Sequence, residues 1–239
     1  MSFNMTHLIV ADEVSRVFAK NIADLPQFYL GSLSPDAVHQ RAGYIPDFKK
    51  CSHLCVGNEE WGMFTNNDEW KESIVNFLFS KKHSENQDFI LGYCCHLITD
   101  VLSNVELWMP FRQKHPKETW YRSGYNNLFH QETNMVDIEL ALSWDKKNLY
   151  WSNLEKSIGV DLDNLVYARE VDAQKDVVLN HWYTGKDRQN IDANKFITYE
   201  LTMDFIKNAR DSIVPIFQAY LDIHNDTYTA YAEVCEGGI

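Results

Sequence analysis

The sequence predicts an all-α fold in which the 239 residues form one multi-helix bundle. Apolar residues recur at helical spacing in several long segments, whereas the apolar–polar alternation that is typical of strands is weak. Only six Pro and ten Gly are present, and no Pro lies between Pro116 and Pro215. Long stretches without proline favour helices over a sheet protein with many turns. Because no repeat or flexible linker interrupts the chain, residues 1–239 are expected to form a single domain.

The elements can be placed in order along the chain. Residues 7–20 are expected to form the first helix, with Thr6 as N-cap and His7 in the first turn. Residues 31–50 contain three turn signals and are expected to form an ordered loop. Further helices are expected at residues 68–82, 86–104, 128–144 and 202–224, with shorter ones at 147–157 and 170–183.

Two of these helices have distinctive patterns. Residues 86–104 are apolar nearly all round, which predicts the central buried helix of the bundle. Gly92 within it leaves room for another backbone or for an ion. Residues 202–224 place Ile206, Ala209, Ile213, Phe217 and Tyr220 on one face. Pro215 should kink or interrupt this last helix, because proline cannot donate a backbone hydrogen bond.

Charge and cysteine content narrow the functional classes. The formal net charge of −12 repels the phosphates of long nucleic acids, so a nucleic-acid binder is not expected. Five cysteines, two of them adjacent, form a poor disulfide framework. The first residues lack the pattern of a signal peptide, and no window reaches the roughly 18 apolar residues of a membrane-spanning helix. These features predict a reduced, cytoplasmic protein.

The central helix carries the first candidate for chemistry. His96 and Asp100 are four residues apart, so they lie on one face of the helix. An imidazole and a carboxylate in this arrangement can bind one metal ion or help to bridge two. A charged carboxylate in an apolar helix is costly unless it is paired or bound to metal. A buried hydrogen bond between His96 and Asp100 explains the pair equally well.

Three further residues are candidates, each with a simpler explanation of its own. Asp36 ends the segment Gly-Ser-Leu-Ser-Pro-Asp, where a turn could hold a ligand or a general base, although Ser-Pro-Asp also starts many helices. His53 lies between Cys51 and Cys55, at a spacing that is not that of a zinc finger. His7 alone would be an ordinary residue of a helix start.

The order of these residues along the chain is more informative than any one of them. The motifs are Thr6-His7-Leu8-x-x-Ala11, Phe28-x-x-Gly31-Ser32-x-x-Pro35-Asp36, Ser52-His53 and Gly92-Tyr93-x-x-His96-Leu97-x-x-Asp100. This series resembles the bacterial zinc-dependent phospholipase C family, in particular its small non-secreted members. The motifs cover roughly residues 5–140, and the resemblance in length and helix content extends over the whole chain.

The resemblance implies a zinc-dependent phospholipase C type of helical bundle and a set of zinc ligands. His7, Asp36, His53, His96 and Asp100 would be these ligands. Asp36 would also be the general base, and Asp100 would bridge two zinc ions. The implied activity is hydrolysis of a phosphoester by zinc-activated water, on a phospholipid or a small phosphoester.

The chain departs from the secreted members of the family in two places. They have an N-terminal Trp that binds zinc through its amine and carbonyl, and a later His with a His-x-x-x-Glu motif for a third zinc ion. The nearest material here is His130, Glu132 and Asp137, which could supply replacement ligands or lie on a solvated helix face. One or two zinc ions, or other divalent metals, are therefore expected rather than three.

Other functions remain open at this stage. A phosphodiesterase or nuclease could use the same scaffold, and a non-catalytic helical protein could keep the metal site without a substrate pocket. A phosphohydrolase built on adjacent His and Asp residues ranks last, because the chain contains no His-Asp dipeptide.

Overall fold

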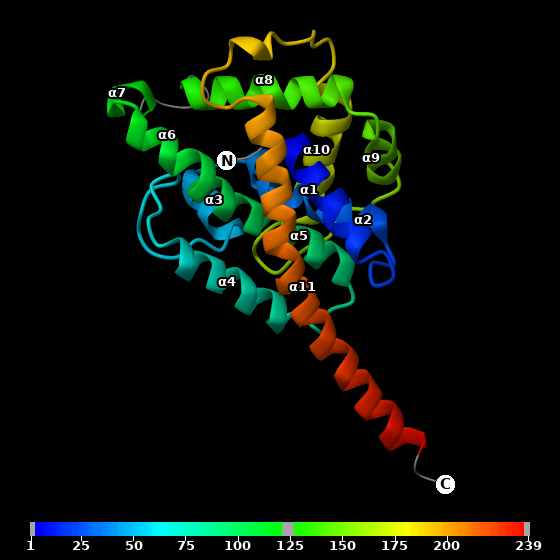
Figure 1. Ribbon diagram of the computed structural model, residues 1–239. Coiled ribbons are helices and arrows are strands. Elements are labelled where there is room, and N and C mark those ends of the chain that lie inside the picture. The colour runs from blue at the N-terminus through cyan, green and yellow to red at the C-terminus, as the bar shows by residue number, and fades with distance from the viewer. Residues whose placement is uncertain (1–2, 121–126, 237–239) are drawn as a thin grey trace.

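The protein is built from helices, as predicted. The computed structural model describes residues 3–120 and 127–236, without the side chains of residues 118, 119 and 224–236. In this part of the chain no strand is formed, and the only β-type pairing is a bridge between Leu162 and Val166. The all-α class is therefore confirmed (Figure 1).

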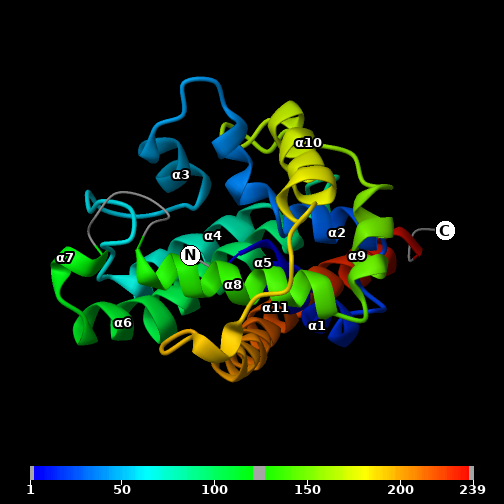
Figure 2. The same ribbon diagram turned by 90° about the horizontal axis from the view of Figure 1, so that it is seen from above.

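Helix α5 (Gln87–Ser103) is the centre of the bundle. Every residue from Phe89 to Val101 is buried, as expected for a helix that is apolar nearly all round. Its neighbours in contact are α1 (Asn4–Val17), α2 (Leu25–Gly31), α4 (Asn67–Ser80) and α11 (Tyr199–Glu236). Figures 1 and 2 show these helices on different sides of α5. The prediction of a central buried helix is confirmed.

Two glycines allow α2 and α5 to cross closely. A Cβ atom on Gly92 would lie 2.0 Å from the carbonyl oxygen of Phe28, and one on Gly31 would lie 2.1 Å from the carbonyl oxygen of Phe89. Both distances are far below van der Waals contact, so no other residue fits at either position without moving a helix. Gly92 therefore makes room for a second backbone, one of the two roles expected for it.

Residues 31–50 do not form the loop that their turn signals predicted. They contain the 3-10 helix η1 (Ser34–Gln40), the start of α3 (Pro46–Ser52) and, at Gly31, the end of α2. Each of these three short helices has a proline at its first or second position. A missing N–H costs little there, because the first N–H groups of a helix have no partner within it. The prolines mark helix starts, so the loop prediction was wrong.

The start of α1 also differs from the prediction. The helix begins at Asn4, its N-cap is Phe3, and Thr6 lies inside the first turn instead of capping it. The Phe3 side chain makes no capping bond. A side chain from a distant helix caps instead, because the Met5 N–H donates to Asp137 Oδ1 at 2.8 Å. Propensity at the helix start cannot reveal a cap that lies 132 residues away.

The last helix is longer than expected. Helix α11 runs from Tyr199 to Glu236 and continues through Pro215, so the predicted interruption is wrong. Pro215 is exposed, and the Asp211 carbonyl that loses its helical partner can be solvated instead. The predicted face is confirmed, since Ile206, Ala209, Ile213, Phe217 and Tyr220 are all buried.

The remaining elements complete the bundle around this centre. They are η2 (Asn104–Trp108), α6 (Met109–Lys114), α7 (Lys117–Trp120), α8 (Leu128–Ser143), α9 (Lys147–Leu154), α10 (Ala168–Asp176), η3 (Val177–Trp182) and η4 (Ile191–Ala193). The two π-helical segments η2 and η3 continue directly from α5 and α10. The helices predicted at 68–82, 128–144, 147–157 and 170–183 correspond to α4, α8, α9 and α10 with η3.

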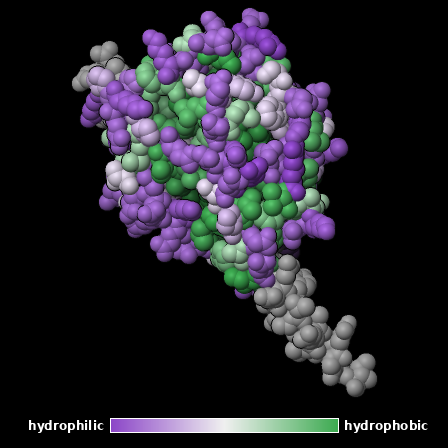
Figure 3. All heavy atoms as spheres, viewed as in Figure 1, coloured by the Kyte–Doolittle hydropathy of each residue, from purple (hydrophilic) through white to green (hydrophobic). Residues whose placement is uncertain are grey.

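The surface agrees with the acidic, polar composition. Figure 3 shows hydrophilic residues over much of one face, with smaller hydrophobic patches between them. Among the described helices, none combines the length and the apolar character needed to cross a bilayer.

Candidate metal centre

Helix α5 provides two of the candidate ligands. His96 and Asp100 lie one turn apart on its buried length, and the Nε2 atom of His96 is 3.8 Å from Asp100 Oδ2. Their side chains are only 1% and 0% exposed. The direct hydrogen bond that would explain the pair without a metal is absent at this distance.

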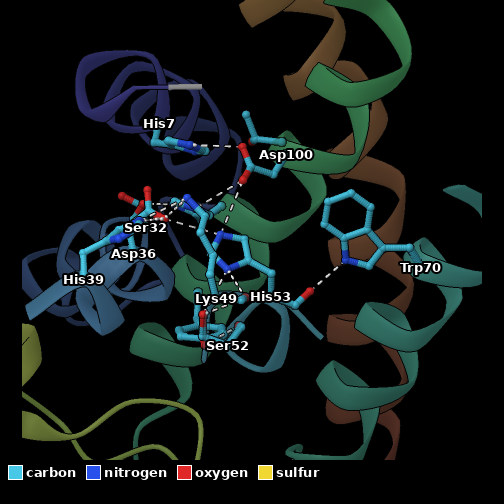
Figure 4. Close-up of polar contacts among 12 residues, drawn as sticks. His7, Ser32, Asp36, His39, Lys49, Ser52, His53, Trp70 and Asp100 are labelled. Carbon is cyan, nitrogen blue, oxygen red and sulfur yellow. Dashed lines mark hydrogen bonds and ion pairs between the residues drawn. The ribbon is translucent and has the colours of Figure 1, made fainter. Parts of the chain in front are cut away.

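Helix α1 adds a third candidate. His7 lies close to Asp100, with 3.5 Å between Nε2 and Oδ1 (Figure 4). Its ring stacks on that of His96, with centroids 3.6 Å apart and an interplanar angle of 5°. Stacking turns the two Nε2 atoms toward the same carboxylate. His7, His96 and Asp100 together can hold one metal ion.

His53 approaches from the other side, at the C-cap of α3. Its Nε2 atom is 3.4 Å from Asp100 Oδ2 and 3.6 Å from Asp36 Oδ1. The carbonyl of His53 accepts a hydrogen bond from Trp70 Nε1 at 2.7 Å, which fixes the backbone at the end of α3 to helix α4. His53 therefore lies between the two candidate carboxylates.

Asp36 lies in the first turn of η1, so the segment Ser-Pro-Asp is a helix start and also part of the site. Asp36, His53 and His96 make a second group that can hold a metal ion, and it shares His96 with the first group. The Asp36 side chain is 18% exposed, the most open of the five predicted residues. The structure thus brings all five residues together. Figure 4 labels His7, Asp36, His53 and Asp100 at this centre.

The ring nitrogens show whether a cation fits here. His96 Nδ1 donates to the carbonyl oxygen of Ser32 at 2.8 Å, and His53 Nδ1 donates to that of Lys49 at 2.9 Å. A carbonyl can only accept, so the Nδ1 atoms carry the protons, and burial keeps both rings neutral by lowering their pKa. Both Nε2 atoms then present lone pairs and have no hydrogen-bond partner in the described chain.

These lone pairs face negative oxygens. Burial by itself would raise the pKa of Asp36 and Asp100, but the pKa of each is held well below its ordinary value. The main opposing charge at Asp36 is the Lys49 ammonium, and at Asp100 nearby positive charge acts together with His53 and His7. Buried lone pairs that face carboxylates repel each other unless a cation lies between them. The site therefore fits a divalent metal with nitrogen and oxygen ligands, and zinc suits this set.

Outer contacts orient the candidate ligands, as they do in many metal sites. The Ser32 carbonyl that holds His96 follows α2 directly, so the glycine crossing of α2 and α5 places it. Tyr93 OH donates to the carbonyl of Ser52 at 2.5 Å and fixes the residue before His53.

The possible replacement ligands on α8 have other functions. Glu132 is buried and accepts the backbone N–H groups of residues 195, 196 and 197. Asp137 is buried and binds the start of α1 and the hydroxyl of Tyr183. His130 bonds Asn127 through Nδ1 at 2.9 Å. These residues are absent from the two groups that can hold a metal ion within the described residues, and both acids are buried rather than solvated.

Sequence reasoning missed two residues at the centre. Lys49 Nζ is 2.6 Å from Asp36 Oδ1, and His39 Nε2 is 3.7 Å from the same oxygen. Burial and the Lys49 ammonium lower the pKa of His39 to about 4, although Asp36 opposes this, so its ring is neutral. Lys49 precedes His53 by four residues, and this helical spacing could have revealed it.

A hollow on the surface lies away from the five residues. It measures about 460 Å³ and is lined by residues of α8, of η3 and of the segment after η3. None of the five predicted ligands lines it. Among the five, Asp36 has the most exposed side chain, at 18%, although its Oδ1 atom is buried.

A family model described as zinc dependent phospholipase C matches residues 6–234. No curated protein and no solved structure matches the chain.

Proposed function

The chain belongs to the zinc-dependent phospholipase C family, and from this premise we propose that it hydrolyses a phosphoester at the centre on α5. The family consists of metal-dependent, phospholipase-like hydrolases, and the chain has His and Asp groups that can bind the metal ion. The finer assignment, hydrolysis by zinc-activated water with Asp36 as the general base, is our proposal.

One observation carries this proposal. Three buried imidazoles, of His7, His53 and His96, direct Nε2 atoms without hydrogen-bond partners at two carboxylates that remain ionised. Such an arrangement costs free energy in a bare protein and becomes favourable with a bound cation. A site built in this way at the centre of the fold indicates a resident metal ion.

The residues have distinct tasks in the proposed reaction. A bound zinc ion lowers the pKa of its water to about 7 and polarises a phosphoryl oxygen. The Asp100 carboxylate lies near the imidazoles of His7 and of His53, so it would be a ligand on either side of which an imidazole can bind a metal ion. Asp36, the most exposed of the five, would accept a hydrogen bond from the attacking water and direct it at phosphorus. Because the pKa of Asp36 is low, it orients the water while ionised.

The proposed substrate is a phospholipid or a small phosphoester. The net charge of −12 disfavours a long polyanion, whereas a single phosphate can be neutralised by the metal and by the Lys49 ammonium. We also propose that residues 1–239 form one domain, supported by the extent of the family match. A cytoplasmic location remains a prediction, supported by the free thiols of Cys51, Cys55, Cys94 and Cys95.

Elemental analysis and substrate assays test the proposal together. The wild type should contain zinc, and His96→Ala and Asp100→Ala should lose most of it. His83→Ala, at an exposed histidine, is the matched control and should keep the metal. Unchanged zinc content in both site variants would eliminate the centre.

A substrate panel separates the functions that share this scaffold. It contains phosphatidylcholine, para-nitrophenyl phosphoesters and single-stranded DNA. We expect zinc-dependent cleavage of the first or second. Cleavage of DNA alone would identify a nuclease, and bound zinc without any cleavage would favour a non-catalytic metal-binding protein.

A further inference from the structure

We propose that Lys49 supplies the positive charge beside Asp36 and excludes a metal ion from that side of the centre. The metal would then be held by the group of His7, His96 and Asp100 alone. This inference rests on the proposed function of the centre and specifies how many ions it takes.

The position of the Lys49 ammonium is the first argument. Lys49 is buried on α3, and its Nζ atom is 2.6 Å from Asp36 Oδ1 (Figure 4). The same atom is 3.4 Å from His39 Nε2 and lies 4.6 Å from the ring centre of Trp61. A carboxylate, a neutral imidazole and an aromatic face are all favourable neighbours for a cation.

Competition for one oxygen is the second argument. The second metal-binding group needs the Asp36 carboxylate together with His53 and His96. Asp36 Oδ1 faces His53 Nε2 at 3.6 Å, and this same oxygen forms the ion pair with the Lys49 ammonium. A zinc ion binds a carboxylate oxygen at about 2.0–2.2 Å, so it would lie within a few ångströms of the ammonium and be strongly repelled.

The backbone of Lys49 gives the third argument. Its carbonyl oxygen accepts the hydrogen bond from His53 Nδ1 that fixes the imidazole. The residue that orients His53 is therefore the one whose side chain neutralises Asp36. Lys49 cannot leave the site by a simple rigid shift of α3 without also moving His53.

The other group is separate from this ion pair. His7 and Asp100 are close to each other, and they belong to a metal-binding group that does not include Asp36. The two groups share only His96. Wild-type protein should thus bind one zinc ion, and loss of the ammonium should open the second position.

Metal stoichiometry tests this without any activity measurement. The full-length protein is stripped with a chelator, desalted and titrated with zinc in a calorimeter, and bound zinc is then measured by elemental analysis. We expect one zinc per chain in the wild type and in Lys49→Arg, which keeps the charge. Lys49→Met keeps the apolar stem against Trp61 and should bind two. Lys50→Met, the neighbouring lysine on α3, is the matched control and should bind one.

The outcomes separate this inference from the proposed function. Two zinc ions in the wild type, or one in Lys49→Met, overturn the inference while the metal centre stands. No zinc in any protein overturns both. If every protein binds the expected number of zinc ions but none hydrolyses a phosphoester, only the proposed function is overturned. If circular dichroism shows that Lys49→Met is unfolded, Lys49→Gln takes its place under the same criteria. Asp36→Asn in the two-zinc variant should return the count to one.

Discussion

Replacing Gly92 by Ala adds one methyl group where α2 crosses α5. The new Cβ would lie 2.0 Å from the carbonyl oxygen of Phe28, 2.9 Å from its carbonyl carbon and 3.1 Å from the Ser32 nitrogen. All three are backbone atoms, so no side-chain rotation relieves the overlap. Helix α2 would have to move away from α5 by roughly 1 Å to restore van der Waals contact.

Two opposing terms set the size of the effect on stability. Overpacking of a well-packed interior costs about 1–3 kcal/mol and sometimes more. Replacing a glycine in the middle of a helix by alanine gains about 1 kcal/mol of helix propensity. Because the added methyl group of Gly92→Ala clashes with backbone atoms, we place its overpacking cost at or above the upper end of the range of about 1–3 kcal/mol. The expected net loss is about 2–3 kcal/mol in the free energy of unfolding.

The same movement should disturb the metal centre. Displaced α2 carries Ser32, whose carbonyl holds His96 Nδ1 at 2.8 Å, and it leads directly into η1 with Asp36. Loss of such an orienting bond typically weakens metal binding by about 10–100-fold. We therefore expect Gly92→Ala to lower the zinc affinity by at least about 10-fold.

Urea unfolding in chelator, followed by circular dichroism, and zinc calorimetry measure the two effects. Thr99→Ala, also on α5, is the control, because it removes a bond to the carbonyl of Cys95 within the helix and adds no atom toward α2. It should cost about 1 kcal/mol and leave zinc affinity unchanged. If Gly92→Ala unfolds with the same free energy as wild type, the close crossing of α2 and α5 is refuted. If it loses stability but keeps wild-type zinc affinity, the link between the crossing and the metal centre is refuted.

Three further predictions concern single side chains. Burial raises the pKa of Asp137 to about 7, so its stabilising contribution is present below about pH 4 and is lost as pH rises through 7. The measured quantity is the difference between the unfolding free energies of wild type and Asp137→Asn, both in chelator. This difference should fall by up to about 4 kcal/mol from pH 4 to pH 8, and a constant difference would contradict the prediction. Trp70→Phe leaves the buried His53 carbonyl without its donor and should cost about 1–3 kcal/mol of unfolding free energy, whereas a wild-type value would show that the bond is unimportant. Glu132→Gln should lower the urea midpoint but keep the zinc content, and loss of zinc would identify Glu132 as a ligand.

The sequence predicted the long helices because their signal is local. Apolar residues at helical spacing fix one buried face, and α5 is apolar nearly all round, so its central position followed from composition alone. The last helix was predicted on the correct face but was ended too early, and its proline was judged without knowing that Pro215 faces solvent. Exposure is a tertiary property, and it decides whether a proline inside a helix is tolerated.

The region of residues 31–50 could not be predicted in the same way. Its helices have seven residues each, too few for a periodic pattern, and the prolines that start them are also turn signals. What holds η1 and α3 in place is distant in sequence. Asp36 pairs with Lys49 across the two elements, and Trp70 on α4 binds the end of α3.

The candidate site was predicted unevenly. Only the spacing of His96 and Asp100 indicated proximity from helix geometry, and His7, Asp36 and His53 were added through the resemblance to a family. The structure brings the five together because three separate elements converge on α5. That these residues are zinc ligands, and that Asp36 is the general base, remain predictions, of which the variants above test the ligand roles of His96 and Asp100.

The acidic residues of α8 show why carboxylates alone do not identify a metal site. Glu132 and Asp137 are as buried as a ligand would be, yet their oxygens accept backbone N–H groups that arrive from residues 195–197 and from Met5. The oxygens of Asp100 instead lie 3.4–3.8 Å from three imidazole Nε2 atoms. In His96 and His53 the ring proton is on Nδ1, which donates it to a backbone carbonyl. The Nε2 atom of each ring can therefore only accept a hydrogen bond. Acceptor nitrogens beside a carboxylate favour a cation between them, whereas N–H donors beside a carboxylate do not. Whether a buried carboxylate meets acceptors or donors depends on residues that are distant in the sequence. A metal-binding acid is therefore distinguished from a structural one by the fold and not by the sequence motif.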